Sequence, residues 1–395
     1  MKKTNIALII FSNGLGGAEQ VVINLIKKFD DSKFNIYLIT NDEMLIYFEN
    51  IIDQQKIYSI GSLYVLVKNK RLNKIINKIL NTFNMKKYIL KFKVSSINKF
   101  LTDNNIKILH SHLMFDLFVT NLLKYKNNNI KTVYTLHGFL NLDEAIQIKY
   151  SISRTDFLKS ITNMDYITSV SKLLENKLLE IIPSAKEKSK YLPNGIDENH
   201  IYHIKKSNNL VSKEYVKLLF MGGEKEVKGG ILLFEAIKYL VVVLGITNFK
   251  LVVLGPINFK GQFYLNIKND KILSKYIEVI GFIDPPKHLS YVYDADILVM
   301  PSLSEGMPIA LLEAIALNTC VVASNIDVFQ SLIEDERSGL LSEIDSVHFA
   351  IALKKLILNK QLCKQILINN KTYNIPYWKD VIKEYENIYF KLLQG

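Results

Sequence analysis

Short apolar runs alternate with amphipathic segments along the first half of the chain. These runs have the length and composition of buried strands: TNIALIIF, NIYLIT, IKILHSH, KTVYTLHG and DYITSVS. Between the first two runs, the large apolar residues of segment 18–29 fall on one helical face: Ala18, Val21, Val22, Leu25 and Phe29. Because strands that alternate with helices form βαβ units, the pattern predicts an α/β fold with a parallel sheet.

A polar stretch with turn residues, PNGIDENHIYHIKKSNNL, interrupts this pattern, and a second series of strand-like runs follows it: YVKLLFMGG, KLVVLG, IEVIGF, DILVMPS and TCVVAS. A chain of 395 residues is also long for one hydrophobic core. We therefore predict two Rossmann-like, doubly wound domains, 1–195 and 196–375. The tail, 376–395, carries apolar residues at helical spacing and needs a surface to cover, for which the first domain is the candidate.

Glutamates follow one of the strand-like runs of the second domain. Doubly wound sheets bind ligands at the carboxyl ends of their strands, so two such domains facing a central cleft can hold two substrates. After DILVMP, Pro308 suits a first helical turn, which places Glu305 in a loop and Glu313 one to two turns into a helix. Glutamates at this spacing are commonly just a solvated helix face, but their position after an apolar strand favours a site.

The same loop offers backbone amides. At a helix start, the N–H groups of Gly306 and Met307 form a ready site for a diphosphate. The two carboxylates beside it can accept hydrogen bonds from sugar and ribose hydroxyls.

Histidines close two strand-like runs of the first domain. His137 ends KTVYTLHG, where a polar side chain is expected to face the ligand crevice, with a buried, hydrogen-bonded histidine as the alternative. His110 and His112 end the preceding run and are candidates for the acceptor side.

Glycines follow the first run. Gly14, Gly16 and Gly17 let the backbone come close to a phosphate or sugar. A dinucleotide fingerprint would need a glycine where Glu19 stands, and no acidic residue closes NIYLIT, which disfavours an NAD-dependent dehydrogenase. The sequence also lacks a GxSxG nucleophile elbow and a DxD pair in a nucleotide-binding loop, so no metal is implied.

The order of the motifs resembles that of the retaining glycosyltransferase family 4, the group 1 glycosyltransferases with the GT-B fold. The resemblance extends over nearly the whole chain: GLGGAEQ, LHSHL, TLHG, TSVSK, YLPNGID, MGGEKEVKGG, VIGFI, YDADILVMPSLSEGMPIALLEAIA and CVVASN. It implies a GT-B fold, with two Rossmann-like domains facing a central cleft. The N-terminal domain would take the acceptor and the C-terminal domain a UDP- or GDP-linked sugar as co-substrate, without a cofactor.

The resemblance also implies roles for individual residues. Glu305 would contact the transferred sugar, and Glu313 the ribose of the nucleotide. Lys228, in KEVKGG, would neutralise the donor diphosphate, and His137 would approach the sugar from the first domain. Further donor contacts are expected from Gly306, Met307, Gly16, Gly17 and Lys225.

The chain departs from the family pattern near Lys228. The family usually has an arginine five or six residues earlier, where this sequence has Gly223 and Gly222. The second cation for the diphosphate must then come from Lys225 or from a basic residue elsewhere.

The implied activity is metal-independent, anomer-retaining transfer of a hexose to a hydroxyl of a glycan or lipid-linked acceptor, in bacterial surface polysaccharide synthesis. Attack on the same face, with the leaving phosphate taking the proton, is inherited from the resemblance. Two alternatives stay open: a nucleotide-sugar epimerase of similar fold, and a non-catalytic binding subunit, which the missing arginine would suit.

Charge is unevenly distributed along the chain. The formal net charge is +12, and residues 61–100 hold ten basic side chains, interleaved with large apolar residues, and no acidic one. This segment fits either a basic amphipathic helix on an anionic membrane or a packed helix with a solvated lysine face. Nucleic acid is disfavoured because no recognisable binding module accompanies the charge.

Location and redox state follow from what the sequence lacks. No segment approaches the ~20 apolar residues of a membrane span, so we expect a cytoplasmic protein, with peripheral binding at the inner face of the plasma membrane as the open question. Cys320 and Cys363 are far apart in sequence and predict neither a zinc site nor a disulfide framework.

Overall fold

The computed structural model describes residues 3–61, 85–138, 153–207 and 214–394. The chain divides into two compact units, one of Met1–Asn194 with Trp378–Gly395 and one of Gly195–Tyr377. The sequence pattern sets the divisions after residues 195 and 375, and the structure sets them after 194 and 377.

The first unit is built on a seven-stranded parallel sheet in the order β3-β2-β1-β4-β5-β6-β7. Its strands are β1 Thr4–Ile9, β2 Phe34–Thr40, β3 Ile57–Ser59, β4 Ile108–Ser111, β5 Lys131–Leu136, β6 Tyr166–Ser169 and β7 Ser189–Tyr191. In β1, Ile6 and Leu8 enter one apolar cluster and Ala7 and Ile9 the other, because a central parallel strand is buried on both faces. The strand order reverses between β1 and β4, where a doubly wound sheet opens its ligand crevice.

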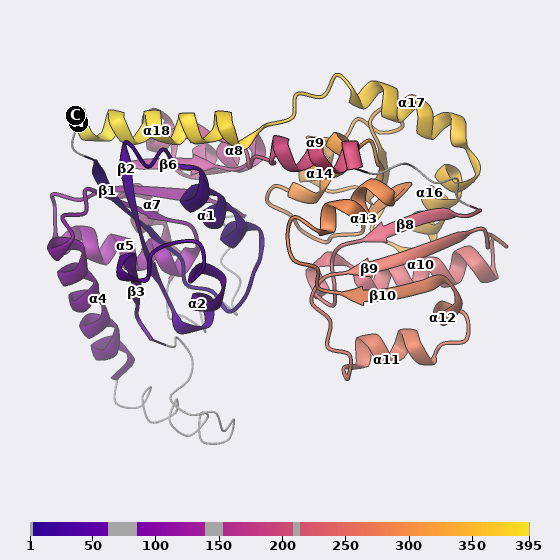
Figure 1. The fold of residues 1–395 in the computed structure, drawn as a ribbon, viewed down its shortest axis with the longest axis horizontal. Helices are drawn as coiled ribbons and strands as arrows, with labels where there is room; N and C mark the ends of the chain where they lie inside the picture. Colours follow the sequence, from indigo (N-terminus) through magenta and orange to yellow (C-terminus); the bar gives the residue numbers. More distant parts are fainter. Residues whose placement is uncertain (1–2, 62–84, 139–152, 208–213, 395) are drawn as a thin grey trace. The chain divides into compact units, whose positions relative to one another are not determined.

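Helices cover both faces of this sheet (Figure 1). They are α1 Gly17–Lys28, α2 Asp42–Phe48, η1 Gln54–Lys56, α4 Met85–Asp103, α5 Met114–Lys126, α7 Arg154–Thr162, α8 Lys172–Ile181, η2 Pro183–Lys188 and α18 Trp378–Gln394. One apolar cluster takes its helical residues from α1, α2 and α18, and the other takes them from α4 and α5.

The C-terminal helix α18, yellow in Figure 1, belongs to the core of the first unit. Its buried face comprises Trp378, Val381, Ile382, Tyr385, Ile388 and Tyr389. Tyr389 stacks on Phe29 of the α1 end at 5.4 Å between ring centroids, and Lys33 pairs with Glu386 at 2.9 Å. A segment from the end of the chain thus completes a core whose other residues precede Gly195.

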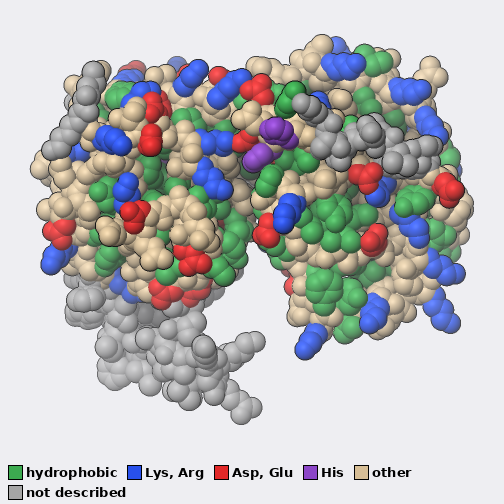
Figure 2. Space-filling model, in the orientation of Figure 1, with side chains coloured by type: hydrophobic (Ala, Val, Ile, Leu, Met, Phe, Trp, Pro, Cys, Tyr) green, Lys and Arg blue, Asp and Glu red, His purple; other side chains and the backbone are tan. Residues whose placement is uncertain are grey.

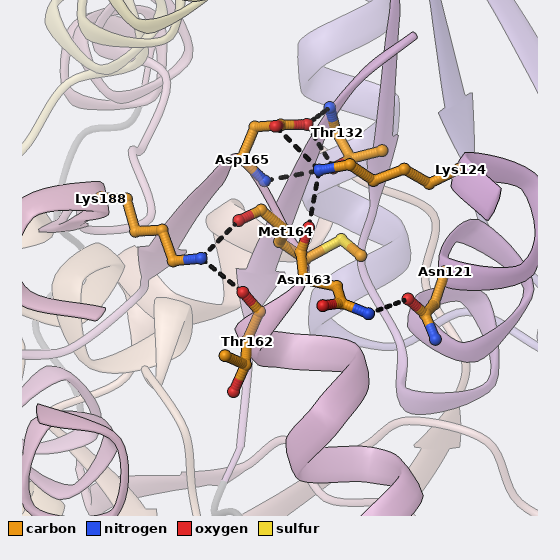
Figure 3. A network of polar contacts seen from close by, with 8 residues as sticks. All are labelled: Asn121, Lys124, Thr132, Thr162, Asn163, Met164, Asp165 and Lys188. Atoms are coloured by element: carbon orange, nitrogen blue, oxygen red, sulfur yellow. Dashed lines mark hydrogen bonds and ion pairs between the residues drawn. The ribbon is translucent and has the colours of Figure 1, made fainter. Parts of the chain in front are cut away.

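A polar network holds the C-terminal end of α7 (Figure 3). Lys188 Nζ donates to the carbonyl oxygens of Thr162, at 2.5 Å, and Met164, at 2.9 Å. Lys124 Nζ donates to the carbonyl oxygen of Asn163 at 2.7 Å. Lys188 therefore satisfies the carbonyl group of the last residue of α7, and both cations bind carbonyl groups that directly follow the helix, where its dipole is negative.

The second unit contains a six-stranded parallel sheet in the order β10-β9-β8-β11-β12-β13. Its strands are β8 Val216–Phe220, β9 Phe249–Leu254, β10 Ile277–Gly281, β11 Ile297–Met300, β12 Cys320–Ser324 and β13 Leu340–Ser342. The order reverses between β8 and β11, so the position at which a doubly wound sheet binds ligands lies at the carboxyl ends of these two strands.

Helices α10 and α16 pack together on this sheet, and α13 packs against α14 and α9. The helices of the unit are α9 Glu198–Ser207, η3 Glu226–Lys228, α10 Gly230–Val242, α11 Gln262–Asn269, α12 Leu273–Tyr276, α13 His288–Asp294, α14 Ile309–Leu317, α15 Asp327–Gln330, α16 Ser346–Leu358 and α17 Lys360–Asn370. Cys320 and Cys363, distant in sequence, are neighbours here: Cys320 Sγ lies 3.5 Å from the carbonyl oxygen of Cys363, and both are free thiols.

The basic stretch 61–100 lies largely outside the described residues, which resume at residue 85. Where its side chains are described, α4 buries Val94 and Ile97 against the first sheet and leaves Lys99 exposed. This last part of the stretch is a packed helix with a solvated lysine. Over the described residues, basic and acidic side chains are interspersed on the face drawn in Figure 2.

Candidate active site

The candidate residues of the second unit lie in the segments that follow β8 and β11, at the carboxyl edge of the sheet. Glu305 lies in the loop after β11, and Glu313 lies in the second turn of α14, as the spacing predicts. Pro308 occupies the N-cap of α14, so the backbone of Gly306 and Met307 immediately precedes the helix start. The Met307 side chain is buried, whereas Gly306 is partly exposed.

An ion pair joins two of the predicted residues. Lys228 Nζ lies 2.6 Å from Glu305 Oε1, and Ser302 Oγ donates to the same oxygen at 2.8 Å. The Glu305 side chain is 9% exposed and that of Lys228 33%, so the carboxylate is held nearly buried while the cation reaches solvent. Ser302, which the sequence analysis missed, fixes the carboxylate from within its own loop.

Gly229 makes this pairing possible. Its φ is +71°, and a Cβ on it would lie 1.9 Å from the carbonyl oxygen of Pro301. Glycine therefore lets the loop after β8 close against the loop after β11, where Leu303 N–H donates to Val227 O at 2.8 Å. Lys228, the residue before this glycine, is thereby brought to Glu305.

Gly222 and Gly223 explain the departure from the family pattern. Gly223 has φ +57°, and a Cβ there would lie 2.4 Å from the carbonyl oxygen of Pro256. A Cβ on Gly222 would lie 2.1 Å from the Phe220 ring. A side chain at Gly223 would thus meet backbone atoms, and one at Gly222 would meet the buried Phe220 ring, so this loop has no room for an arginine at either position. Lys225 is exposed in the same loop, at the N-cap of η3.

Glu313 pairs with a residue that the sequence analysis missed. His288 Nε2 lies 3.1 Å from both carboxylate oxygens of Glu313, and the two side chains are 14% and 12% exposed. No spacing links them in the sequence; the packing of α13 on α14 brings them together. His288 is the first residue of the short helix α13, at the carboxyl edge of the sheet, and this position is the signal in the sequence that could have identified it.

In the first unit, the glycines that follow β1 differ in their surroundings. Gly16 is the N-cap of α1, and a Cβ on it would lie 2.7 Å from Glu19 Oε2, a buried carboxylate. Gly14 and Gly17 have open space at the Cβ position. Only Gly16 is therefore needed for close packing, and Gly17 leaves its backbone accessible.

A buried aspartate fixes the ends of β1 and β4. Asp116, at the third position of α5, accepts from the backbone N–H groups of Phe11 at 3.0 Å and Leu113 at 2.9 Å. Burial raises its pKa well above the usual range, although these hydrogen bonds act in the opposite direction. Asp116 is not among the residues predicted from the sequence, although an acidic residue at this helical position is typical of a cap.

The three predicted histidines of the first unit lie in one stack. Ring centroids are 4.2 Å apart for His110 and His112 and 5.4 Å for His112 and His137. His110 is fully buried; its Nδ1 lies 2.6 Å from the Tyr389 hydroxyl and its Nε2 2.7 Å from Thr135 Oγ1. Both ring nitrogens of His110 are thus engaged by the protein, which leaves none for an acceptor.

His112 and His137 differ from His110. His112 Nδ1 lies 3.1 Å from His137 Nε2, and His137 is partly exposed at the carboxyl end of β5. Burial lowers the pKa of His137 to about 3 and that of His112 well below its usual range. Both rings are therefore neutral near pH 7, which suits hydrogen bonding rather than charge pairing.

The chain's relationship to known proteins agrees with this arrangement. The pattern of the family described as glycosyl transferases group 1 matches residues 203–373, and that of glycosyltransferase family 4 matches residues 15–200. The chain is a group 1 glycosyltransferase of family 4. The resemblance inferred from the motif order is confirmed.

Relatives of this glycosyltransferase cover most of its length. It is 26% identical over 383 residues to an uncharacterized glycosyltransferase of Methanocaldococcus jannaschii, covering 96% of this chain and 95% of the relative. It is 28% identical over 285 residues to the capsular polysaccharide biosynthesis glycosyltransferase CapH of Staphylococcus aureus, with coverage of 70% and 75%. It is 24% identical over 312 residues to the UDP-Gal:alpha-D-GlcNAc-diphosphoundecaprenol alpha-1,3-galactosyltransferase of Escherichia coli, with coverage of 73% and 77%.

The fold of this glycosyltransferase is also found among solved structures. Anabaena HepE, solved in complex with UDP, superposes with a TM-score of 0.70 at 15% identity, over 98% of this chain and 100% of that one. The prediction of a two-domain α/β GT-B fold is confirmed.

The described residues of the glycosyltransferase show neither a metal-binding cluster nor a membrane-spanning helix. They contain no group of three or more histidine, cysteine or carboxylate side chains arranged to hold a metal ion. None of their helices has both the length and the apolar character that crossing a bilayer requires.

Proposed function

We propose that this glycosyltransferase moves a hexose from a nucleoside-diphosphate sugar to a hydroxyl of a glycan or lipid-linked acceptor in bacterial surface polysaccharide assembly. The names of the relatives support this: one acts in capsular polysaccharide biosynthesis, and another transfers galactose from a UDP-sugar to a diphosphoundecaprenol-linked sugar. The UDP in the structure of Anabaena HepE favours a uridine nucleotide as the donor.

The Lys228–Glu305 ion pair carries the proposal. A departing nucleoside diphosphate gains negative charge as the glycosidic bond breaks, and a fixed cation lowers that barrier. Lys228 supplies this cation, and the nearly buried Glu305 carboxylate accepts hydrogen bonds from the hydroxyls of the sugar. Glu313, eight residues further along the chain and held by His288, is placed to accept from the ribose.

The remaining contacts follow the same logic. The amides of Gly306 and Met307, ahead of α14, would donate to the diphosphate. Gly16 and Gly17 would bring the backbone of the first unit to the donor, and His137 would donate to the transferred sugar. Lys225 is the nearby basic residue that can add positive charge, because Gly222 and Gly223 leave no room for an arginine.

Retention and metal independence belong to the proposal. The acceptor hydroxyl attacks the anomeric carbon on the face from which the diphosphate leaves, the C–O bond to the phosphate breaks, and a phosphate oxygen takes the acceptor's proton. Lys228 supplies the positive charge at the diphosphate, so the reaction runs without a metal. The product linkage, determined by NMR, would keep the donor's anomeric configuration; an inverted product would contradict this mechanism.

Glu305→Gln tests the site. The variant keeps the size of the side chain but removes the charge that Lys228 and Ser302 hold, and contacts that strengthen in the transition state act on the barrier. We expect kcat to fall by about 100-fold or more with the fold intact. The assay measures release of UDP and of glycosylated product from a panel of UDP-sugars and synthetic lipid-linked acceptors.

Glu343→Gln is the matched control, because Glu343 is exposed in the second unit. Loss of rate in both variants, or in neither, would contradict the assignment of Glu305. Conversion of the donor sugar without an acceptor would point to an epimerase, and nucleotide binding without turnover on any acceptor would point to a binding subunit.

Peripheral membrane binding through residues 61–100 also remains a proposal, because residues 62–84 lie outside the described part of the chain. Its support is the ten cations without a compensating acid, each worth up to about 1 kcal/mol near an anionic surface. Flotation with anionic vesicles at low and high salt measures it. Replacement of Lys70, Arg71, Lys74 and Lys78 by glutamine should release the protein.

A further inference from the structure

One hydrogen bond joins His112 to His137 and gives His112 a role of its own. His112 Nδ1 lies 3.1 Å from His137 Nε2. The His112 ring is 1% exposed, and its Nε2 has no hydrogen-bond partner among the described residues. His137 is partly exposed, and the bond to His112 is the one hydrogen bond that its ring makes within the described part of the chain.

The two rings share a single N–H group across this contact. Burial keeps both rings neutral near pH 7, since it lowers the pKa of each well below the usual range. A neutral imidazole carries one N–H and one bare nitrogen, so one ring donates and the other accepts.

The partnerless nitrogen of His112 decides between the two arrangements. If His137 donated, the proton of His112 would sit on its Nε2, as a buried N–H without an acceptor. If His112 donates from Nδ1, its Nε2 is a bare acceptor instead. Orphaned buried N–H groups are rarer than unfilled acceptors, so the second arrangement is favoured. His137 then accepts at Nε2 and carries its own proton on Nδ1.

Neighbouring residues hold the His112 ring in the position from which its Nδ1–H donates to His137. Its ring stacks on that of His110 at 4.2 Å, and His110 is fixed by the Tyr389 hydroxyl and Thr135. The backbone N–H of Leu113, the next residue, donates to the buried Asp116 at 2.9 Å, which fixes the main chain beside His112. A donor whose partners fix both its ring and its backbone is preorganised.

We propose that His112 is a positioning residue whose Nδ1–H holds His137 in the Nδ1-protonated tautomer, so that His137 offers an N–H donor to a hydroxyl of the transferred sugar. The sugar contact rests on the proposed function, whereas the tautomer of His137 is a property of the free protein. His112 thus acts through His137 and not as an acceptor-side residue.

The tautomer can be read directly. In protein with ¹⁵N-labelled histidine, long-range ¹H–¹⁵N correlation distinguishes protonated from bare ring nitrogens, and the His137→Gln variant assigns the His137 signals among the seven histidines. We expect a protonated Nδ1 and a bare Nε2 in the wild-type protein. A protonated Nε2 would overturn the proposal.

Two variants test whether His112 causes this state. His112→Phe keeps a ring to stack on His110 but removes the N–H, so His137 should become a mixture of tautomers and kcat should fall about tenfold, the rate equivalent of one hydrogen bond, with KM changed less. His112→Asn retains an N–H donor near the Nδ1 position, and should keep the tautomer and turn over faster than His112→Phe. His203→Phe, an exposed histidine of the second unit, is the control.

The outcomes separate this proposal from the proposed function. If His112→Phe leaves the wild-type tautomer of His137, or if His112→Asn loses it as fully as His112→Phe, the positioning role is overturned. If no sugar is transferred by the wild-type protein on any acceptor, the proposed function fails, while the NMR result still decides the tautomer.

Discussion

Gly223 shows how a single backbone position can rule out a side chain that a family normally uses. Its φ of +57° belongs to the left-handed region, and a Cβ would lie 2.4 Å from the carbonyl oxygen of Pro256. Strain in that region alone costs about 1–2 kcal/mol. We expect Gly223→Ala to lower the free energy of unfolding by more than this, because the clash adds to the strain. Chemical denaturation of the full-length wild-type and variant proteins measures this loss.

Gly245→Ala separates the two contributions. Gly245 has φ +68° but nothing within 4 Å of its Cβ position, so its substitution should show the backbone strain without the clash. Equal losses at the two positions would mean that the approach of Pro256 does not exclude a side chain at Gly223.

His110 links the stability of the first unit to pH. Burial lowers its pKa to about 3 in the folded protein, whereas an unfolded histidine titrates near 6.5. Between these values the unfolded chain binds the extra proton, so stability is full above about pH 6.5 and falls as the pH decreases. One such histidine contributes a slope of up to about 1.4 kcal/mol per pH unit.

The His110→Gln variant should therefore unfold with a shallower pH dependence between pH 4 and 6 than the wild-type protein. Urea unfolding followed at several pH values measures the slopes. His203→Gln, at an exposed position in the second unit, is the control and should unfold with the wild-type slope. If the unfolding free energies of His110→Gln and wild type changed in parallel with pH, His110 would be protonated equally in the folded and unfolded states.

At the scale of elements, the end of α7 depends on lysines from other segments. Lys188 donates to two carbonyl oxygens at this end (Figure 3), and Lys124 pairs with Asp165 at 2.8 Å. Lys188→Met keeps the aliphatic stem and removes these hydrogen bonds. We expect a loss of about 1 kcal/mol of stability, discounted for the partial exposure of the ammonium group.

Thermal unfolding should show this as a decrease of about 2–4 °C in Tm for a unit of this size. Lys186→Met, an exposed position in the same short helix η2, is the control and should leave Tm in place. A decrease in Tm for Lys188→Met that is no larger than that for Lys186→Met would mean that water satisfies the carbonyl groups at the end of α7 equally well.

For the whole molecule, the periodicity of the sequence predicts two parallel sheets and their longer strands, but not the three-residue edge strands β3, β7 and β13. The order of the motifs predicts the family. The pairing of Glu313 with His288 could not be predicted, because it depends on how α13 packs on α14. His110 was predicted at the acceptor side, but it lies beneath Tyr389 of α18, a residue 279 positions later. Period and spacing report local structure, whereas such contacts are set by tertiary packing.

Nucleotide binding is expected to stabilise the second unit, because Lys228 and Glu313 both belong to it. UDP at 100 times its Kd should stabilise the state that binds it by about 2.7 kcal/mol. Hydrogen exchange should then slow in the loops 221–229 and 301–308, which carry the lysine and the helix-start amides. A panel of UDP, GDP and ADP identifies the donor base by the size of the thermal shift.

Lys228→Gln tests the source of that stabilisation. Loss of hydrogen bonds between a cation and a diphosphate, worth about 1.5–3 kcal/mol, should weaken UDP binding by roughly tenfold or more. Lys238→Gln, which removes a cation that pairs with Asp270 at 2.7 Å, should bind UDP as the wild type does, because a charge this exposed is screened by solvent. Equal weakening in both variants would mean that UDP responds to the net charge of the unit, and the diphosphate would then have to be held by other groups.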